Sequence, residues 1–532
     1  MLAAAAIGAI WTSISPDNGV SAVLDRLVQI EPKVLFADNG TIYNGKSWSS
    51  IAKVVQIIEG LKTLELVVLI KNIPAAQPEI GDLKSPDALV VVEYESFLSS
   101  SPVGVPLRFE QLPPSHPLYV LYSSGTTGLP KAIVHTALGT LIQHKKEHKL
   151  HCSMDSTSRL LYYTTTSWMM WHWSVSALAC GSTLVLYSGS PFKPHGHLSL
   201  PRLLSSLKVT HFGTSAAYLI TLETNHVYPS ASLDLTHLQA IYSTASPLPP
   251  STFSFVYKAF PSHINLGSIT GGTDIISLFG APCPLLPVYE GEIQCAGLGM
   301  AIDVVDSITG ERTPGEDGEL VCTKPFPCQP LTFWGPNGEN KYKASYFERF
   351  DNVWHHGDFV RIDVRTGGLT MLGRSDGVLK PSGVRFGSAE IYNVLTRFFG
   401  GIVEDAVCVG RRRETDRDET VCLFVAMSEG HDFTDKLRSD IQQVQLPPSS
   451  SPCPASGVLS KSRYCHVRTE LSPRHVPAIV EEAAGGIPRT GNGKKIEVTV
   501  KQILSGINIK TNASVANPES LAWFQTWAAN HN

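Results

Sequence analysis

Short apolar, β-rich runs alternate with helix-like stretches over residues 1–373 of the chain. Strands that are apolar along their whole length are typical of parallel sheets, because helices cover both faces of such a sheet. The pattern therefore predicts an α/β fold in which layered sheets and helices form a large N-terminal domain. The clearest strand-like runs are Lys33–Ala37, Leu66–Ile70, Leu89–Val92 and Thr183–Tyr187.

Residues 374–505 have the pattern of a second, smaller unit. A chain of 532 residues is far longer than one ordinary domain, so at least two domains are expected. After Gly373 the pattern predicts a helix at Glu390–Phe399, a strand at Asp405–Val409 and a helix at Phe433–Gln443. We interpret this unit as a small, mobile α+β domain.

Two segments near the C-terminus are expected to lack regular structure. Pro447–Gly457 is rich in proline and serine and cannot continue a helix, so residues 444–463 are interpreted as an insert in the small domain. Residues 506–532 are mostly polar, apart from the aromatic residues around Trp523 and Trp527, and are interpreted as a tail.

The composition excludes several classes of protein. A formal net charge of -4 argues against a strongly basic surface for nucleic acid. The ten cysteines form no Cys-x-x-Cys pair, so we expect reduced thiols in the cytosol rather than a zinc site or a disulfide framework. Met1–Trp11 is apolar, but it lacks a positive flank and is too short to span a bilayer. We interpret it as part of a buried helix and expect no integral membrane segment.

Tyr119–Lys131 carries the strongest functional signal. An apolar strand runs into a loop of hydroxyl residues and glycines that ends in a lysine. Glycines let backbone N–H groups approach a phosphate closely, while hydroxyls add donors and the lysine adds charge. The spacing differs from that of the P-loop, which disfavours a P-loop ATPase. The candidate phosphate-binding residues are Ser123, Ser124, Gly125, Thr126, Thr127, Gly128 and Lys131.

This segment resembles the signature of the adenylate-forming superfamily, which includes acyl-CoA synthetases, luciferases and peptide-synthetase adenylation domains. Five further motifs match in the family's order and extend the resemblance over nearly the whole chain. The first is Ile241–Leu248, which resembles the segment that lies against adenine. The resemblance implies that Ala245, Ser246 and Pro247 contact the nucleotide.

The second motif, Gly272-Thr273-Asp274, resembles the family's Thr-Glu element, with aspartate in place of the usual glutamate. The resemblance implies that Gly272 and Thr273 contact the nucleotide, with Thr273 at the α-phosphate and catalytic. It also implies that Asp274 helps to hold Mg²⁺, and the shorter aspartate could reach the metal through water. The third motif ends in Asp358 and resembles the His-Gly-Asp element, whose carboxylate accepts hydrogen bonds from the ribose hydroxyls.

The fourth motif, Gly373–Arg385, resembles the hinge between the two domains. The implied roles are ribose contact for Arg374, phosphate contact for Arg385, the pivot for Asp376, and CoA contacts for Ser382 and Gly383.

The fifth motif, Pro488–Lys494, resembles the segment that carries the adenylation lysine, which implies that Lys494 is catalytic. We expect that replacement of the neighbouring Lys495 is tolerated.

Three segments resemble the short-chain branch of the superfamily and, within it, the acetoacetyl-CoA synthetases. They are Thr166–Trp173, Gly189–Pro194 and Gly271–Ser277. The resemblance implies an acyl pocket, although the tryptophans and methionines of the first segment could equally be plain core packing. In acetyl-CoA synthetases a tryptophan closes the pocket where this chain has glycine, and its absence would open space for a longer acyl chain. We therefore expect Gly271→Trp to lower acetoacetate use more than acetate use. Alternatively, Gly271 only serves a tight turn. The implied pocket residues are Trp168, Met169, Trp171 and Gly271.

The resemblance implies a two-step ligase reaction with ATP, CoA and a small carboxylic acid as substrates and Mg²⁺ as cofactor. The acid, acetoacetate, forms an acyl-adenylate with release of pyrophosphate, and CoA then displaces AMP. Two alternatives stay open. One is another short- or medium-chain acyl-CoA synthetase, and the other is a non-catalytic member of the fold.

The second alternative depends on the N-terminus. Met1–Trp11 resembles an internal helix of the family's large domain, so the chain is interpreted as an N-terminally truncated member. Missing strands and helices would leave apolar surface and strand edges open. We therefore expect poor expression or aggregation of residues 1–532 alone, and recovery when the missing segment is added.

Overall fold

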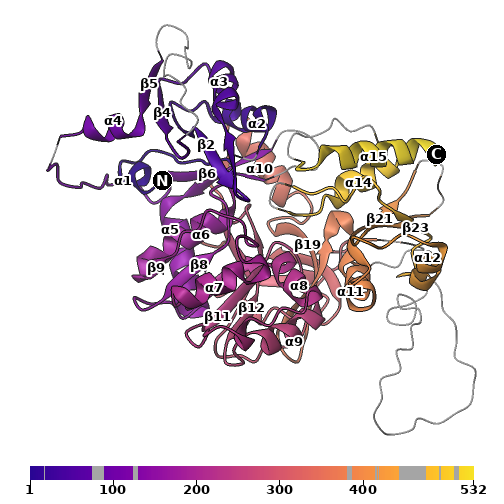
Figure 1. Cartoon of the computed structure of the whole chain (residues 1–532). Helices are drawn as coiled ribbons and strands as arrows, with labels where there is room; N and C mark the ends of the chain where they lie inside the picture. The colour runs from indigo at the N-terminus through magenta and orange to yellow at the C-terminus, as the bar shows by residue number, and fades with distance from the viewer. Residues whose placement is uncertain are drawn as a thin grey trace, which may run out of the picture.

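The chain forms a large domain and a smaller domain that lie side by side, and Figure 1 shows the first in colours from indigo through magenta to salmon and the second in orange and yellow. The computed structural model describes residues 1–16, 18–74, 89–102, 104–123, 130–379, 381, 386–413, 416, 418–442, 475–490, 493–507 and 515–531.

A five-stranded parallel sheet lies at the centre of the large domain, in the order β12-β11-β10-β8-β9. Its strands are β8 (Arg159–Tyr162), β9 (Thr183–Leu184), β10 (His211–Ser215), β11 (Ala240–Thr244) and β12 (Asn265–Ser268). The helices that belong to this part are α5 (Ala137–Lys146), α6 (Met169–Ser176), α7 (Ser199–Ser206), α8 (Ala216–Thr224) and α9 (Pro250–Ala259).

Both faces of this sheet are buried because alternate residues point to opposite sides. Phe212 and Ile241 pack into a core that α7, α8 and α9 complete. Tyr242 follows Ile241 on β11, and Tyr162 occupies the equivalent position on β8, so both side chains point to the opposite face. There they pack into a second core with Trp173 of α6. The apolar runs in the sequence are therefore explained by helix cover on both faces.

A second parallel sheet, of three strands in the order β1-β4-β5, lies near the N-terminus. Its strands are β1 (Val34–Asp38), β4 (Leu66–Ile70) and β5 (Val90–Glu93), with helices α2 (Val20–Ile30), α3 (Ile51–Gly60) and α4 (Tyr94–Ser99) and a hairpin of β2 (Gly40–Tyr43) and β3 (Lys46–Ser49) beside it. Val34, Phe36 and Val90 are exposed. The effect of an added N-terminal segment stays a prediction.

The prediction of a buried helix at Met1–Trp11 is wrong. Only Leu2–Ala6 (α1) is helical, none of its residues is buried, and Leu2 and Ile7 are exposed. Five residues are too few for a stable isolated helix, and little of this one packs on the domain. Of this segment, Met1 and Trp11 are the residues that pack against the central core.

Antiparallel sheets complete the large domain and carry much of the candidate site. The first contains β6 (Pro117–Ser123), β7 (Lys131–Thr136) and β18 (Thr332–Phe333). The second contains β13 (Thr270–Gly272), β14 (Ser277–Ala281) and β15 (Cys295–Ala296). The third has β16 (Ile302–Val305), β17 (Asp317–Cys322), β19 (Trp354–Ile362) and β20 (Leu369–Arg374), and α10 (Gly338–Tyr346) precedes β19.

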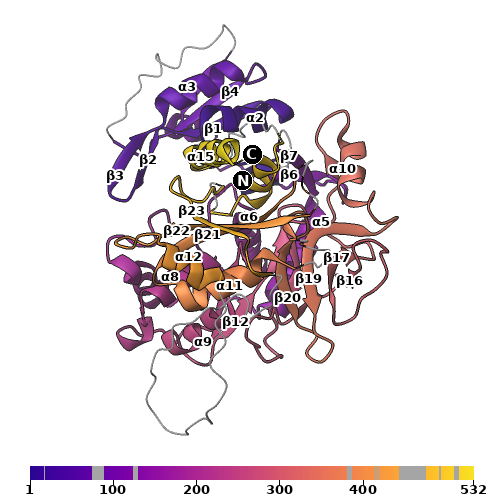
Figure 2. The ribbon, with the colours of Figure 1, turned by 90° about the vertical axis from the view of Figure 1, so that its right-hand side faces the viewer.

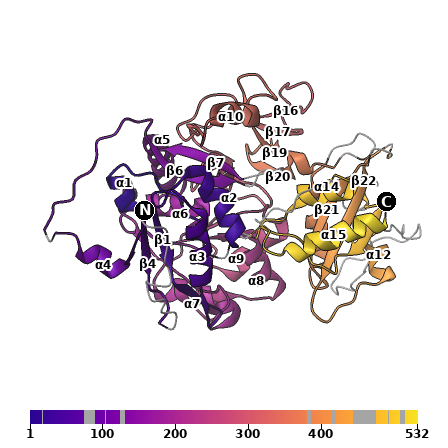
Figure 3. The same cartoon turned by 90° about the horizontal axis from the view of Figure 1, so that it is seen from above.

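The small domain is a three-layer unit in which helices pack on both faces of one sheet. Figure 2 shows α12 and α15 on opposite sides of this sheet. The chain leaves β20 at Arg374 and passes through a short helix, η6 (Ser375–Gly377). The sheet contains β21 (Val403–Arg411), β22 (Thr420–Met427) and β23 (Ile479–Glu482), and the helices are α11 (Ser388–Phe399), α12 (Asp435–Gln442), α14 (Glu497–Leu504) and α15 (Pro518–Asn530). In Figure 3 the strands β19 and β20 lie on the side of the large domain that faces this unit.

The interpretation of residues 506–532 as an unstructured tail is wrong for residues 518–530, which form α15. Phe524 and Trp527 pack with Phe424 and α14 in one face of the small-domain core. The buried positions recur at helical spacing, and Pro518 stands in the first turn, where proline is well tolerated. The interpreted insert at 444–463 lies outside the described residues. Every helix in the described ranges is too short or too polar to cross a membrane.

Candidate active site

Two of the predicted nucleotide-binding segments meet at one edge of the parallel sheet. Ala245 follows β11, and Thr273 follows the short strand that continues from β12. The carboxyl ends of parallel strands commonly form ligand sites, because the loops that follow them gather there. Ala245 has a φ of 78°, a left-handed value that is uncommon for a residue with a side chain. Ser246 and Pro247, next to it, are exposed.

Asp274 lies in a ring of polar groups at this edge. Its Oδ1 accepts a hydrogen bond from Ser123 Oγ at 3.4 Å and another from the Tyr346 hydroxyl. Burial raises the pKa of Asp274, but the nearby charge of Lys131 and the Tyr346 hydrogen bond outweigh burial and hold the pKa below its usual value. The carboxylate is therefore ionised at neutral pH.

Lys131 lies at the C-terminal end of the predicted phosphate loop. It pairs with Ser123 in the β6–β7 hairpin, so the loop leaves and returns at the same place beside Asp274. The Lys131 ammonium lies 5.0 Å from the ring centroid of Tyr346 and 5.5 Å from that of Phe333. Aromatic faces attract a cation, so they hold this lysine at the site. The predicted residues Ser124, Gly125, Thr126, Thr127 and Gly128 lie outside the described residues.

Asp358 and Arg374, both predicted at the ribose, form one ion pair. They face each other across β19 and β20, and Arg374 Nη1 lies 2.8 Å from Asp358 Oδ1. Asp358 is buried, and its Oδ2 lies 3.6 Å from His356 Nε2. Gly357 has a φ of 79°, a left-handed value that favours glycine, and Arg374 Nη2 would lie 2.8 Å from a Cβ at this position.

The hinge segment is anchored to the large domain through the buried carboxylate of Glu319. This side chain accepts hydrogen bonds from Ser375 Oγ and from His355 Nε2 at 3.2 Å, and Arg349 Nη2 lies 2.9 Å away. Asp376, the predicted pivot, follows Ser375 in η6. The predicted Arg385, Ser382 and Gly383 lie outside the described residues, so their roles stay predictions.

Buried polar side chains contact the turn after Thr273 through hydrogen bonds. His135 Nε2 lies 3.1 Å from the Thr273 carbonyl oxygen, and His144 Nε2 contacts the carbonyl of Ile276. Ile276 has a φ of 47°, which is a strained value for a β-branched residue. The fully buried Glu147 accepts hydrogen bonds from Ser277 Oγ, from Gln143 and from the Trp173 indole. These contacts fix the turn that carries Thr273 and Asp274.

The buried histidines make the free energy of unfolding depend on pH. Burial is the main cause that lowers the pKa of His135 and His148 to about 3 and that of His172 to about 4. An unfolded chain has imidazole pKa values of about 6.5. Between these values the unfolded state binds more protons than the folded state. The free energy of unfolding therefore falls as the pH drops below about 6.5, by up to roughly 1.4 kcal/mol per pH unit for each histidine.

We expect His172→Phe to reduce this pH dependence by close to one proton. The phenyl ring keeps the edge-on packing on Tyr119, whose ring centroid lies 4.6 Å from that of His172. Urea unfolding between pH 5 and pH 7 measures the slope of the free energy of unfolding against pH. This slope should correspond to about one proton fewer in the variant than in the parent chain. Replacement of the exposed His237 by glutamine is the control and should leave the slope as in the parent chain. An unchanged slope in His172→Phe would contradict the assignment.

The predicted acyl-pocket residues cluster at the start of α6. Trp168 is the N-cap of this helix and is partly buried, Met169 is buried in the central core, and Trp171 is partly buried. The Trp168 ring lies edge-on to Tyr162, with 6.2 Å between centroids. The side chains are thus core packing in part, as one of the two interpretations allowed. Their contact with an acyl group stays a prediction.

The reason given for the substrate effect of Gly271→Trp is wrong. A Cβ at Gly271 would lie 2.1 Å from the Ser277 carbonyl oxygen and 2.6 Å from Leu278 Cα, both in the backbone of β14. The missing side chain therefore leaves room for the neighbouring strand and not for a longer acyl chain. That Gly271 lines the acyl pocket stays a prediction.

We now expect Gly271→Ala to lower stability and to lower acetoacetate and acetate turnover in the same proportion. The methyl group must displace β14, which costs roughly 1–3 kcal/mol, as overpacking does elsewhere. Thermal unfolding and initial rates with both acids measure the two effects. Gly401→Ala, at a position where a Cβ meets nothing within 4 Å, should melt like the parent chain. A selective loss of acetoacetate turnover at unchanged stability would contradict this expectation.

Lys494, the predicted adenylation lysine, lies on a turn of the small domain and is exposed. The expectation that its neighbour Lys495 tolerates replacement stays a prediction, and the contacts of Lys495 argue against it. Lys495 Nζ lies 3.0 Å from Asp405 Oδ1 and 3.8 Å from the ring centroid of Tyr392. Lys495 is therefore a structural residue of the turn. Lys436 on α12, which is exposed, is a better control.

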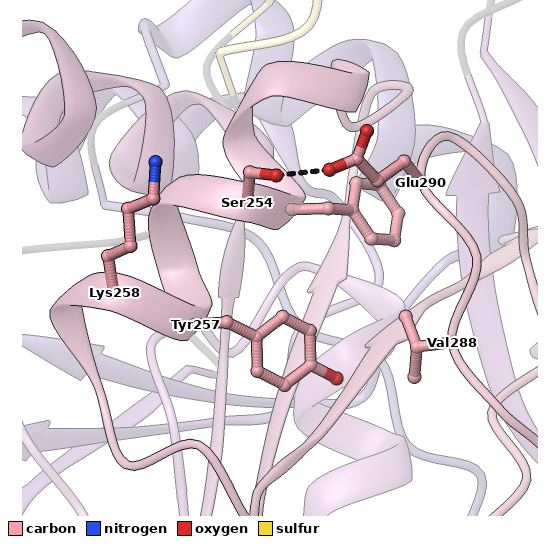
Figure 4. Close-up of a pocket in the computed structure, with 6 residues that line it drawn as sticks. Ser254, Tyr257, Lys258, Val288 and Glu290 are labelled. Carbon is pink, nitrogen blue, oxygen red and sulfur yellow. Dashed lines mark hydrogen bonds between the residues drawn. The ribbon is translucent and has the colours of Figure 1, made fainter.

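One surface pocket of about 370 Å³ lies away from all these residues, between α9 and the chain near Val288. Figure 4 shows the Ser254 hydroxyl directed at the Glu290 carboxylate beside this pocket, with Tyr257 and Lys258 on the same helix. No predicted site residue lines it. In the described part of the chain, no group of three or more His, Cys, Asp or Glu side chains is arranged to hold a metal.

Three residues of the site could not be predicted from the sequence. Tyr346 hydrogen-bonds Asp274, Glu319 anchors Ser375, and Glu147 supports the Thr273 turn through Ser277. Each lies in an element with no motif of its own, so no local pattern identifies it.

The sequence and the structure of this chain are similar to those of known proteins. Residues 1–329 match the family of AMP-binding enzymes. The chain is 47% identical to a malonamoyl-CoA synthetase from Penicillium aethiopicum, over 99% of this chain and 70% of that protein. It is 45% identical to an acetoacetyl-CoA synthetase from Gallus gallus, over 99% of this chain and 74% of that protein. The solved acetoacetyl-CoA synthetase from Streptomyces lividans superposes with a TM-score of 0.85 at 37% identity, over 100% of this chain and 76% of that one.

Proposed function

The chain belongs to the AMP-binding enzyme family, and from this premise we propose that it is an acid–thiol ligase that forms acetoacetyl-CoA. The observation that carries the proposal is the 45% identity to an acetoacetyl-CoA synthetase over 99% of the chain. The substrates are acetoacetate, ATP and CoA, and the products are acetoacetyl-CoA, AMP and pyrophosphate. On the sequence grounds given above, we propose a cytosolic location.

The reaction has two displacements. A carboxylate oxygen of acetoacetate attacks the α-phosphorus of ATP, and the bond to pyrophosphate breaks. The CoA thiolate then attacks the acyl carbon, the thioester forms, and AMP leaves with the bond electrons. The first step brings two anions together, so cations at the site must offset the growing repulsion.

The described site contains residues that could bind ATP and offset the negative charge of the first step. Lys131, held by aromatic rings beside Asp274, would bind a phosphate of ATP. Asp358 and Arg374 would take the ribose hydroxyls, since the carboxylate is an acceptor and the guanidinium holds it in place. Thr273, on a turn that is braced from behind, would donate to the α-phosphate. Lys494 would bridge the attacking carboxylate and the same phosphate.

Mg²⁺ is part of the proposal, with Asp274 as its protein ligand. The carboxylate is held ionised, and Mg²⁺ in nucleotide enzymes is typically bound through one or two carboxylates together with substrate phosphates. A single aspartate beside the phosphate loop therefore fits the ion. When bound, Mg²⁺ would offset charge on the phosphates, while Tyr346 and Ser123 orient the aspartate from the protein side.

Malonamic acid is the second candidate substrate, because the chain is 47% identical to a malonamoyl-CoA synthetase. Malonamate and acetoacetate share a carbonyl group on the carbon next to the methylene, so one pocket could take either acid.

A parallel assay of pyrophosphate release tests the proposal. The chain is supplied with ATP, CoA, Mg²⁺ and one of acetoacetate, malonamate, acetate, butyrate or no acid, and the thioester is identified by mass spectrometry. We expect the highest kcat/KM with acetoacetate. A preference for malonamate would favour the second candidate. Release that no acid stimulates would indicate a non-catalytic member of the fold.

A further inference from the structure

The turn that carries Lys494 is closed at its base by two residues of like charge. Arg489 and Lys495 face each other in an antiparallel bridge, and the Thr490 amide donates to the Lys494 carbonyl at 2.8 Å. The Gly493 amide donates to the Thr490 carbonyl at 2.8 Å and tightens the turn. Both flanking side chains are cationic, so electrostatic repulsion tends to open the base unless an anion lies between them.

Asp405 of β21 is that anion. Its Oδ2 accepts hydrogen bonds from Arg489 Nε at 3.0 Å and Nη2 at 2.6 Å. Its Oδ1 lies 3.0 Å from Lys495 Nζ. Each oxygen of the carboxylate thus holds one side of the turn. A register shift between Val403 and Asp405 marks a bulge in β21, and bulges commonly re-aim a side chain.

The environment of Asp405 makes these contacts stronger than ordinary surface ion pairs. Its side chain is only 16% exposed. Burial raises the pKa of Asp405, but the charges of Lys495 and Arg489 outweigh burial and hold the pKa below its usual value. The Tyr392 ring lies under Lys495, 3.8 Å from Nζ to the ring centroid. Removing one member of a partly buried group leaves uncompensated charge behind, which is costly.

We propose that Asp405 is a positioning residue for the adenylation step, because it fixes the base of the turn that presents Lys494 to the acid and the α-phosphate. This inference rests on the proposed function for the role of Lys494. Asp405 itself touches Arg489 and Lys495 and acts through the turn they close.

The test compares the two half-reactions in Asp405→Asn. We expect acetoacetate-dependent ATP–pyrophosphate exchange to fall at least tenfold in kcat, and thioester formation from supplied acetoacetyl-AMP and CoA to stay within about threefold, since misplacement of a reacting group by about 1 Å can cost a hundredfold. Asp405→Glu, which keeps the charge, should restore part of the exchange. The proposal is overturned if both half-reactions are lost equally, or if ATP–pyrophosphate exchange is unchanged.

A second measurement does not depend on activity. Hydrogen exchange of the peptide 489–496 should be faster in Asp405→Asn than in the parent chain, with the rest of the small domain unchanged. Unchanged exchange in this peptide overturns the proposal even if no acid is activated. The matched control is Asp416→Asn, which removes a carboxylate paired with Arg413 at 2.9 Å in the same domain. The control should slow neither half-reaction, and a loss equal to that of Asp405→Asn also overturns the proposal.

Discussion

Lys494→Ala is expected to lower acetoacetate-dependent pyrophosphate formation by roughly a thousandfold, the upper range for removal of one group that stabilises transition-state charge. A lysine on an exposed turn can reach both the attacking carboxylate and the α-phosphate, where negative charge gathers as the new bond forms. Thioester formation from supplied acetoacetyl-AMP should stay within about threefold, because that step has no pentavalent phosphate to stabilise.

The measurement is ATP–pyrophosphate exchange in parallel with single-turnover thioester formation. Lys436→Ala, on the same domain and exposed, is the control and should behave like the parent chain in both assays. Lys495→Ala should show an intermediate loss of exchange, because it removes one of the contacts that close the turn. Equal losses in the two half-reactions of Lys494→Ala would exclude a role confined to adenylation.

Asp376→Pro is expected to impair thioester formation by roughly a hundredfold or more, the scale for misplaced reacting groups, while adenylation is retained at a much higher level. Two half-reactions at one site need different groups, and rotation of the small domain can supply them. A proline fixes φ near −65° at position 376 and disfavours the helical region for the preceding residue Ser375, which begins the short helix η6. The variant is therefore expected to restrict rotation at the hinge, which the thioester step needs more than adenylation does.

Single-turnover rates for each half-reaction measure this effect. Asp376→Ala is the matched variant, since it removes the carboxylate and leaves the backbone free to rotate. The loss in thioester formation should therefore be larger in the proline variant than in the alanine variant. If both steps survive in the proline variant, the hinge does not lie at this residue.

The order of chemical motifs along the chain could be predicted from sequence, because each depends on residues close together in the chain. The glycines and hydroxyls that end at Lys131, and the apolar strand before them, are one such local pattern. The parallel strands are another, since a run such as Leu66–Ile70 is apolar only where helices cover both faces. From such patterns follow the α/β class and the family, while the hinge position stays a prediction.

Contacts between distant residues were decided only by the tertiary structure. The pairs Tyr346–Asp274 and Asp405–Arg489 are separated by 72 and 84 residues, and no local pattern relates their members. The packing around Gly271 likewise could not be predicted from sequence, because the atoms that exclude a side chain there belong to β14 and not to the strand of Gly271. Charge and steric exclusion act through space over a few ångströms, so the partner of a residue is fixed by the packing of whole elements. The residue types and spacing of a sequence determine what chemistry is available, and folding determines which of those groups meet.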